Sequence, residues 1–318
     1  MLTKFLDPKN DFAFKKIFGT EKNKDILIHF LNDMLTFKDR ALIQDVTFLK
    51  TIQDPETASK KTSIVDILCK DEKDNRYIVE MQVAKEKGFE KRAQYYASKA
   101  YISQAHAGGE YHNLKEVIFL AIAEFIMFPK KKHWKSEHVI LDKDSYEHDL
   151  KDFSFTFLEL PKFQKSIHEL SSISDKWMYF FKNAEKTSEK ELEKLVGKDM
   201  IIERAYEELD RFHWNEEELL TYDQAEKYEG AYIASMAQKY DEGLEKGRIE
   251  GMEKGREEGR TEGLEKGREE GLEKGLEKGK QERELEIAKS LLLQGVDVDI
   301  IISTTQLSKE EIEKLQSS

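Results

Sequence analysis

The sequence of 318 residues contains only one cysteine and four prolines. The single cysteine, Cys69, excludes a disulfide within the chain, and its place in a strand-like run predicts a small buried side chain. A chain without disulfides fits a reducing compartment, so we expect a cytoplasmic protein. The last proline is Pro161, and the residues beyond about 165 show helical patterning throughout.

Long hydrophobic runs and excess basic charge are also missing. The longest apolar stretch, VIFLAIAEFIMF at residues 117–128, is interrupted by Glu124 and is too short to cross a bilayer, so we expect no membrane partner. The formal net charge is −12, which argues against a protein that coats nucleic acid indiscriminately. A local basic surface can still bind phosphate.

The residues that are present predict an α/β fold in the first half of the chain. Asp7 and Pro8 predict the start of a first helix, and Gly19 predicts its end. A second helix should bury the apolar residues that recur at helical spacing: Ile26, Leu27, Phe30, Leu31 and Met34. Five segments are rich in β-formers: 41–49, 62–69, 76–83, 116–125 and 153–160. A helix between the third and fourth should end at Gly108 and Gly109.

We expect the chain to divide into four parts. Residues 1–160 form the α/β domain, and residues 161–240 form a helical region. Residues 241–281 form a charged repeat with glycine at every fourth position, and residues 282–318 form a small helical module.

The segment SIVDILCKDEKDNRYIVEMQV, residues 63–83, predicts two strands joined by a charged turn. A turn centred on Lys73 pairs Leu68 with Ile78 and places Asp66 opposite Glu80. Cross-strand Cβ atoms lie roughly 4.5 to 5.5 Å apart, so the two carboxylates repel unless a cation or a proton neutralises them. Mg²⁺ or Mn²⁺ is the natural cation for oxygen ligands.

Gln82 should lie on the same strand face as Glu80, beside Ile64 of the other strand. In the alternative interpretation, Asp66 and Glu80 lie on the solvated face of an edge hairpin. The flanking residues favour a central strand that is buried on both sides, because neither strand has a polar face: Ile64, Val65, Ile67, Leu68, Val79, Met81 and Val83.

Asp66, thirteen intervening residues and Glu80-Met81-Gln82 resemble the Asp…(Glu/Asp)-X-Lys signature of PD-(D/E)XK nucleases. More narrowly, the chain resembles the recombination-promoting nuclease family, also labelled PD-(D/E)XK family transposases. The segments that carry this resemblance occur in order along nearly the whole chain: NDFAFKKIFG, VDIL, YIVEMQV, KRAQYYASKAY and the EGLEKG units.

The resemblance implies a restriction-endonuclease-like mixed sheet flanked by helices, followed by an all-helical C-terminal region. It also implies a metal-dependent DNA endonuclease, linked to recombination or transposition, that uses Mg²⁺ or Mn²⁺. By carry-over, Asp66, Glu80 and Gln82 are the catalytic residues. Asp66 and Glu80 are also the metal ligands, with the Met81 carbonyl as a third ligand and Asp11 of the first helix as a secondary one.

Two features leave alternatives open. The wider superfamily usually has lysine at the position of Gln82, and glutamine can orient water but carries no positive charge, although glutamine is usual in the narrower family. The alternative function is therefore a catalytically inactive nuclease scaffold that acts in interaction or oligomerisation, and a third is a helical assembly factor. For Asp11, the alternative is an exposed charge favoured by the helix dipole.

The helix within residues 87–109 predicts a DNA-binding face. Arg92, Tyr96 and Lys99 share one side at spacings of four and three, and the small residues Ala93, Ala97 and Ala100 share another. The polar side borders the predicted cleft, where Arg92 and Lys99 would reach phosphate oxygens, or else it is simply solvated. PKKKHWK, residues 129–135, is a second basic cluster that fits either a DNA-backbone loop or a solubilising turn.

Ten glycines occupy every fourth position from Gly243 to Gly279, and we call this segment the glycine ladder. Each glycine inside a helix costs about 1 kcal/mol relative to alanine, and i, i+4 ion pairs return only a few tenths each. The ladder is therefore either a helix stabilised by self-association, which predicts a homo-oligomer, or a mobile charged tether.

The segment after the ladder resembles a helix-turn-helix whose last helix is capped at Ser308 by Glu311. That helix also carries Glu310 and Glu313, which repel phosphate. The pattern therefore favours a packing or oligomerisation module over a DNA reader.

Overall fold

The computed structural model describes residues 3–36, 41–53, 63–105, 109–197 and 199–316. The chain forms two compact units, Met1–Ala234 and Ser235–Ser318, each with its own hydrophobic core. In the described ranges, no helix combines the length and the apolar composition that a bilayer-spanning segment requires.

The first unit contains a mixed sheet of six strands in the order β1-β4-β5-β6-β8-β7. Their bounds are β1 Val46–Phe48, β4 Ile67–Asp71, β5 Arg76–Gln82, β6 Val117–Ala123, β7 Lys135–Val139 and β8 Phe153–Glu159. Strand β5 is antiparallel to β4 and parallel to β6, and β6 is parallel to β8. The mixed sheet expected from the sequence is therefore present, with β5 in its interior.

The predicted register of the hairpin is confirmed, because Leu68 pairs with Ile78. The expected position of Ile64 beside Gln82 is wrong. Ile64 belongs to β3, Ser63–Ile64, which pairs with β2, Ile52–Gln53, in a separate two-stranded sheet. The chain turns away from β5 before Asp66, where the amide of Val65 donates to the carbonyl of Thr51 at 3.2 Å.

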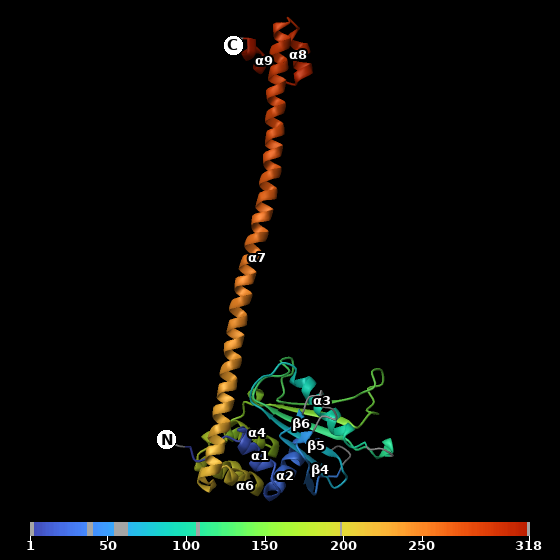
Figure 1. Ribbon diagram of the computed structural model, residues 1–318, viewed down its shortest axis with the longest axis vertical. Helices are drawn as coiled ribbons and strands as arrows, with labels where there is room; N and C mark the ends of the chain where they lie inside the picture. The colour runs from blue at the N-terminus through green and yellow to red at the C-terminus, as the bar shows by residue number, and fades with distance from the viewer. Residues whose placement is uncertain (1–2, 37–40, 54–62, 106–108, 198, 317–318) are drawn as a thin grey trace. The chain divides into compact units, whose positions relative to one another are not determined.

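The two faces of the sheet bury different helices (Figure 1). One face packs on α3, Phe89–Ile102, through the strand residues Leu68, Ile78, Val117, Phe119, Ala121 and Phe157. The other face packs on α1, Asp11–Phe18, α2, Lys24–Met34, α4, Ile173–Asn183, and α6, Met200–Glu208. The helix α5, Glu189–Val196, joins the same core through Leu195 and Val196. The residues that carry a site on the α3 face are thus held by a sheet that is covered on both sides.

Helix α3 presents alanine to the sheet, as expected: Ala93, Ala97 and Ala100 are fully buried. It ends at Ile102, so the predicted end at Gly109 is wrong, and Gly108 lies outside the described residues. The predicted core face of α2 is confirmed, since all five of its apolar residues are fully buried.

Two helix boundaries differ from the sequence prediction. Helix α1 is capped by Asn10 and not by Asp7, because the side chain of Asn10 accepts from the amides of Phe12 and Ala13 at 3.0 and 3.3 Å. Within the region of helical patterning beyond residue 165, the chain is divided into α5 and α6 at Gly197, whose φ of 54° interrupts helical geometry.

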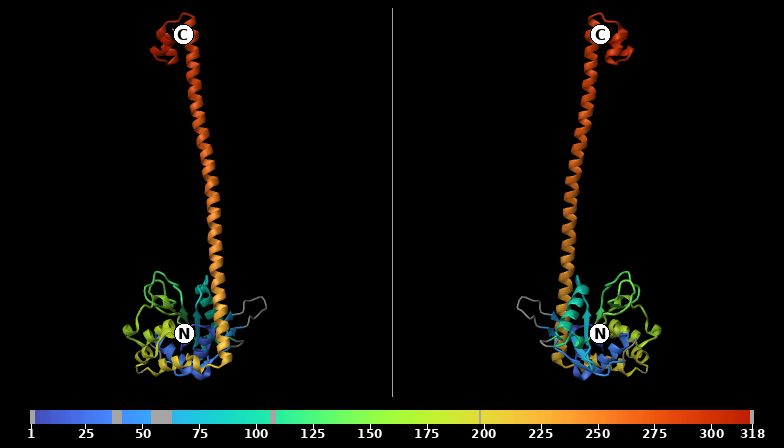
Figure 2. Two further views of the ribbon diagram at one scale, coloured as in Figure 1. Left: turned by 90° about the vertical axis from the view of Figure 1, so that its left-hand side faces the viewer. Right: turned by 90° about the vertical axis from the view of Figure 1, so that its right-hand side faces the viewer.

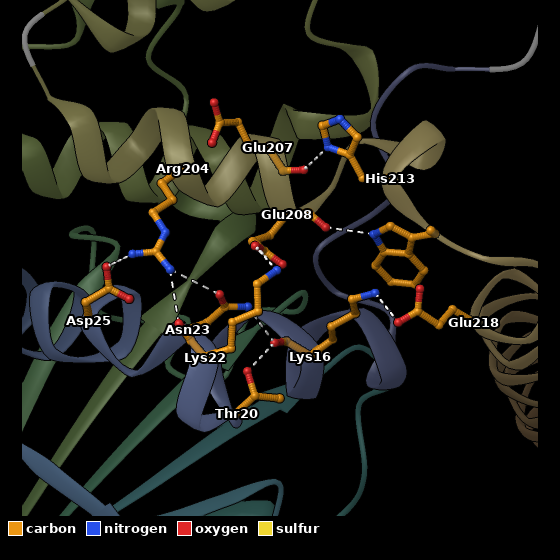
Figure 3. Close-up of polar contacts among 11 residues, drawn as sticks. Lys16, Thr20, Lys22, Asn23, Asp25, Arg204, Glu207, Glu208, His213 and Glu218 are labelled. Carbon is orange, nitrogen blue, oxygen red and sulfur yellow. Dashed lines mark hydrogen bonds and ion pairs between the residues drawn. The ribbon is translucent and has the colours of Figure 1, made fainter.

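A polar network fixes α1 and α2 to the helices that follow the sheet (Figure 3). Lys16 of α1 pairs with Glu218 at 2.5 Å, at the start of the long helix α7, Glu216–Leu293. Arg204 of α6 pairs with Asp25 and donates to the carbonyl of Lys22 at 3.0 Å. The first of these contacts holds α1, and the contacts of Arg204 hold α2 and the turn before it.

The glycine ladder lies within α7 and is helical along its whole length (Figure 2). Its glycines are exposed, and a Cβ added at any of them would meet nothing within 4 Å. The ladder is thus a helix in the structure, and its stabilisation by self-association stays a prediction. The end of α7 packs with α8, Val298–Thr305, and α9, Lys309–Gln316, around the buried residues Ala288, Ile301, Leu307 and Ile312.

Candidate functional site

The hairpin brings Asp66 and Glu80 together on the α3 side of the sheet. Asp66 lies one residue before β4, and Glu80 lies inside β5. The backbone amide of Asp66 donates to Oε1 of Glu80 at 3.2 Å, and the amide of Met81 donates to Oδ2 of Asp66 at 2.9 Å. Each carboxylate is thus held by the backbone of the segment that carries the other, so their separation is fixed by the strand pairing.

Glu80 is buried and Asp66 is partly buried, with a side chain that is 18% exposed, so the place disfavours two negative charges. Glu80 is 3% exposed, and burial together with the charge of Asp66 raises its pKa to about 8. Burial also raises the pKa of Asp66, although the amide of Met81 and the ammonium group of Lys15 act in the opposite direction. A cation bound between the two groups would remove this penalty.

Gln82 continues the same face of β5 and connects Glu80 to α3. Its Nε2 donates to Oε2 of Glu80 at 3.2 Å, and its Oε1 accepts from Arg92 at 2.5 Å. The other terminal nitrogen of Arg92 pairs with Glu86, and Glu86 also accepts from the hydroxyl of Tyr232 on α7 at 2.9 Å. A chain of polar contacts therefore runs from the acidic pair to the beginning of α7.

The predicted DNA-binding face of α3 is only partly gathered at this site. Tyr96 lies beside Arg92, at 6.0 Å from the guanidinium to the ring centre, and burial raises its pKa, with the charges of Glu80 and other carboxylates adding to the shift. Lys99 lies two turns beyond Arg92 and its ammonium group is 5.7 Å from the ring of Tyr95. Arg92 and Tyr96 thus flank the acidic pair, and Lys99 extends the same helix face away from it.

The first helix contributes two charged residues to the edge of the site. Lys15 Nζ lies 2.5 Å from Oδ1 of Asp11 and 3.5 Å from Oδ1 of Asp66. Burial alone would lower the pKa of Lys15, but the hydrogen bond to Asp11 and the charge of Asp66 raise it, so the side chain remains an ammonium ion. The side chain of Asp11 is 61% exposed and reaches the site through this lysine.

The donor set fits a small, hard divalent cation. Mg²⁺ commonly binds through one or two carboxylates and completes its shell with water and substrate phosphate. Asp66 and Glu80 supply two such oxygen donors, and in the described part of the chain no group of three or more His, Cys, Asp or Glu side chains is placed so that it could hold an ion. The Met81 carbonyl as a third ligand and Asp11 as a secondary one stay predictions.

Several residues at the site were missed by sequence reasoning. Lys15 is one of them. Its spacing of four from Asp11 could have revealed it, because this spacing places the two side chains on one helix face. Glu86 lies in the loop before α3, and Tyr232 lies about 150 residues away in sequence, so only tertiary structure brings these two together.

Two known families match the chain. The family described as PD-(D/E)XK nuclease family transposase matches residues 8–238. The family described as Rpn/YhgA-like nuclease family, C-terminal HTH domain, matches residues 281–317. A search among curated proteins found no significant match, and neither did a search among solved structures. The first match confirms the resemblance carried by the sequence motifs, and the second confirms the helix-turn-helix arrangement of the last helices.

Proposed function

Because the chain belongs to the PD-(D/E)XK nuclease family transposases, we propose that it is a DNA endonuclease that requires a divalent metal. Its substrate is a phosphodiester bond, and its reaction serves DNA recombination or transposition. The observation that carries this proposal is the pair formed by Asp66 and the buried Glu80 of β5, which are joined by backbone hydrogen bonds at 3.2 and 2.9 Å.

In the proposed mechanism, Asp66 and Glu80 hold Mg²⁺ or Mn²⁺, and the Met81 carbonyl completes the protein ligands. The bound ion supplies a Lewis acid that lowers the pKa of water and offsets charge on the scissile phosphate. Gln82, fixed between Glu80 and Arg92, orients the attacking water. A new bond forms from water oxygen to phosphorus as the bond to the leaving sugar oxygen breaks, and the proton goes to that oxygen.

DNA would approach along α3. Arg92 borders the acidic pair and carries the planar guanidinium that suits phosphate recognition, and Tyr96 and Lys99 continue the same face. In the structure Arg92 is paired with Glu86, so we propose that a DNA phosphate competes with this carboxylate.

The C-terminal parts support assembly and DNA contact. We propose that the chain forms a homo-oligomer through the glycine ladder, and that the helix-turn-helix module adds a second DNA contact. The helix α9 carries Glu310, Glu311 and Glu313, so any such contact would avoid its acidic side.

Nicking of supercoiled plasmid tests the proposed function. Wild-type protein should nick the plasmid with Mg²⁺ or Mn²⁺ and should lose this activity with a chelator. Asp66→Asn and Glu80→Gln, which keep side-chain shape, should each lower the rate at least about 100-fold, because each removes a charge that holds the ion.

The matched control is Glu90→Gln, an exposed position on α3, which should cleave at the wild-type rate. Absence of nicking by wild-type protein with any divalent metal would contradict the enzymatic function. That result would favour the alternative, a nuclease scaffold used for interaction.

A further inference from the structure

The strand position that usually carries the positive charge of the nuclease signature is neutral in this chain. Gln82 occupies it, and both ends of its amide are bound, Nε2 to Glu80 at 3.2 Å and Oε1 to Arg92 at 2.5 Å. The neutral side chain of Gln82 thus connects Glu80 to Arg92. A side-chain positive charge at the reacting phosphate, in addition to that of the metal ion, would come from another element.

Helix α1 places an ammonium group beside the same carboxylates. Lys15 Nζ lies 3.5 Å from Asp66, and the lysine side chain is 39% exposed, so it is accessible to a substrate as well as to the acid. Oδ1 of Asp11 lies 2.5 Å from the ammonium group, and Asp11 itself is on the solvent-exposed side of the lysine. Lys15 therefore lies between a metal-ligand candidate and the open edge of the site.

The orientation of Lys15 is built into the helix. Phe14, Ile17 and Phe18 fix α1 in the core, and they are all fully buried. Lys16 is rotated by about 100° from Lys15 and binds on the other side, 4.2 Å from the ring centre of Trp214 and 2.5 Å from Glu218 (Figure 3). Of these two neighbouring lysines, one anchors the helix and the other faces the acidic pair.

We propose that Lys15 supplies from α1 the positive charge that Gln82 lacks, and that its ammonium group contacts the scissile phosphate. This inference rests on the proposed endonuclease function. When a divalent ion neutralises Asp66, the ammonium group is released from that carboxylate and can donate to a non-bridging phosphate oxygen. Lys15 transfers no proton in this role, because it acts as a charge and a hydrogen-bond donor.

Arg92 is less suited to this role. Its two terminal nitrogens are bound by Glu86 and Gln82, and neither partner is a metal-ligand candidate. Binding of an ion to Asp66 and Glu80 therefore leaves the partners of Arg92 in place, whereas it removes a partner of Lys15.

The test moves the positive charge from position 15 of α1 to position 82 of β5. Lys15→Met removes the charge and keeps a long side chain, and Lys15→Met with Gln82→Lys returns an ammonium group to the strand. Lys22→Met is the matched control, since the Lys22 side chain is 71% exposed. Three quantities are measured for each: thermal unfolding, the nicking rate at saturating DNA with Mg²⁺, and Mn²⁺ affinity by calorimetry without DNA.

We expect Lys15→Met to nick about 100-fold more slowly at saturating DNA. It should bind Mn²⁺ at least as tightly as wild type, because a competing cation is gone. Gln82→Lys should recover at least tenfold of the rate in the Lys15→Met background, and Lys22→Met should behave as wild type.

Two results would overturn the inference. If Lys15→Met nicks at the wild-type rate, the lysine only neutralises the acidic pair in the absence of metal. If the folded double variant remains as slow as Lys15→Met, the lost charge is not what limits the reaction. A fold defect cannot imitate the expected recovery, because the double variant contains the same Lys15→Met change. Inactive wild-type protein would instead reject the nuclease function, and the inference with it.

Discussion

At the scale of single residues, the acidic pair of Asp66 and Glu80 destabilises the folded protein in the absence of a ligand. Glu80 is almost fully buried in an interior strand, beside the partly buried carboxyl group of Asp66. Two unfavourable charges at a rigid position are typical of a functional site, because the protein gains no stability from them without a ligand.

This instability predicts a pH dependence in the metal-free protein. The pKa of Glu80 rises from an ordinary value of 4.5 to about 8 on folding. Between these values the folded protein retains a proton that the unfolded chain releases, so the free energy of unfolding from this group falls as pH rises. Glu80→Gln, which stays neutral, should show a smaller decrease in melting temperature than wild type between pH 5 and about 8.

Thermal unfolding with a chelator measures this difference. The charges of Asp66 and Arg92 also shift the pKa of Glu80, and wild type and Glu80→Gln both keep these two residues. Glu90→Gln is the control and should follow the wild-type pH profile. Equal slopes for wild type and Glu80→Gln would contradict the raised pKa.

The acidic pair could be predicted from the sequence, but its surroundings could not. Strand parity and the central turn place Asp66 near Glu80, because hairpin register follows from local sequence. The contacts of Glu86 with Arg92 and Tyr232 join three elements that are distant in sequence, and no local pattern encodes them.

At the scale of elements, strong periodicity gave reliable predictions. Helix α2 and the alanine face of α3 follow from helical spacing, and the buried strand β6 follows from its continuous run of apolar β-forming residues. The sequence prediction missed β2 and β7 and merged β3 with β4 in one segment. These strands are short or carry charged residues such as Lys135. Their position is decided by pairing with other strands and not by propensity.

Helix α1 depends on aromatic packing for its place at the site. Phe18 is fully buried and its ring lies 5.2 Å from Phe30, 5.6 Å from Phe181 and 6.0 Å from Trp177, between ring centres. Phe18→Ala should lower the free energy of unfolding by about 3 to 5 kcal/mol, because it leaves a cavity among these rings.

Denaturant unfolding measures this loss. The control is Phe212→Ala, since Phe212 is 81% exposed and should change stability by no more than about 0.5 kcal/mol. A Phe18→Ala protein as stable as the control would show that α1 does not depend on this cluster.

At the scale of the whole molecule, the glycine ladder is the least expected feature. It is helical although glycine disfavours helix, and in the single chain a Cβ added at any of its glycines would meet nothing within 4 Å. A four-residue step advances 400° around the helix, so the glycine line winds slowly and leaves a groove that a second helix could approach closely.

Replacing ladder glycines separates helix stability from association. The variant with Gly247, Gly255, Gly263 and Gly271 changed to alanine should be more helical by far-UV circular dichroism, because alanine is the better helix former by about 1 kcal/mol per site. If the ladder mediates self-association, the same variant should sediment as a smaller species than wild type. Gly230→Ala, in α7 but outside the ladder, should sediment as wild type does.

Unchanged sedimentation of the four-alanine variant would contradict an oligomer formed through the ladder. Such a result would leave the helix as a spacer between the nuclease-like unit and the helix-turn-helix module, and association would have to be sought on another surface.

The central claim is that Asp66 and Glu80 hold one divalent cation. Anomalous diffraction from crystals soaked in Mn²⁺ tests it most directly. We predict one peak on the α3 side of the sheet, about 2.1 Å from an oxygen of each carboxylate, and no peak there in Glu80→Gln crystals. A peak that contacts only one of the two carboxylates, or none at saturating Mn²⁺, would contradict the account.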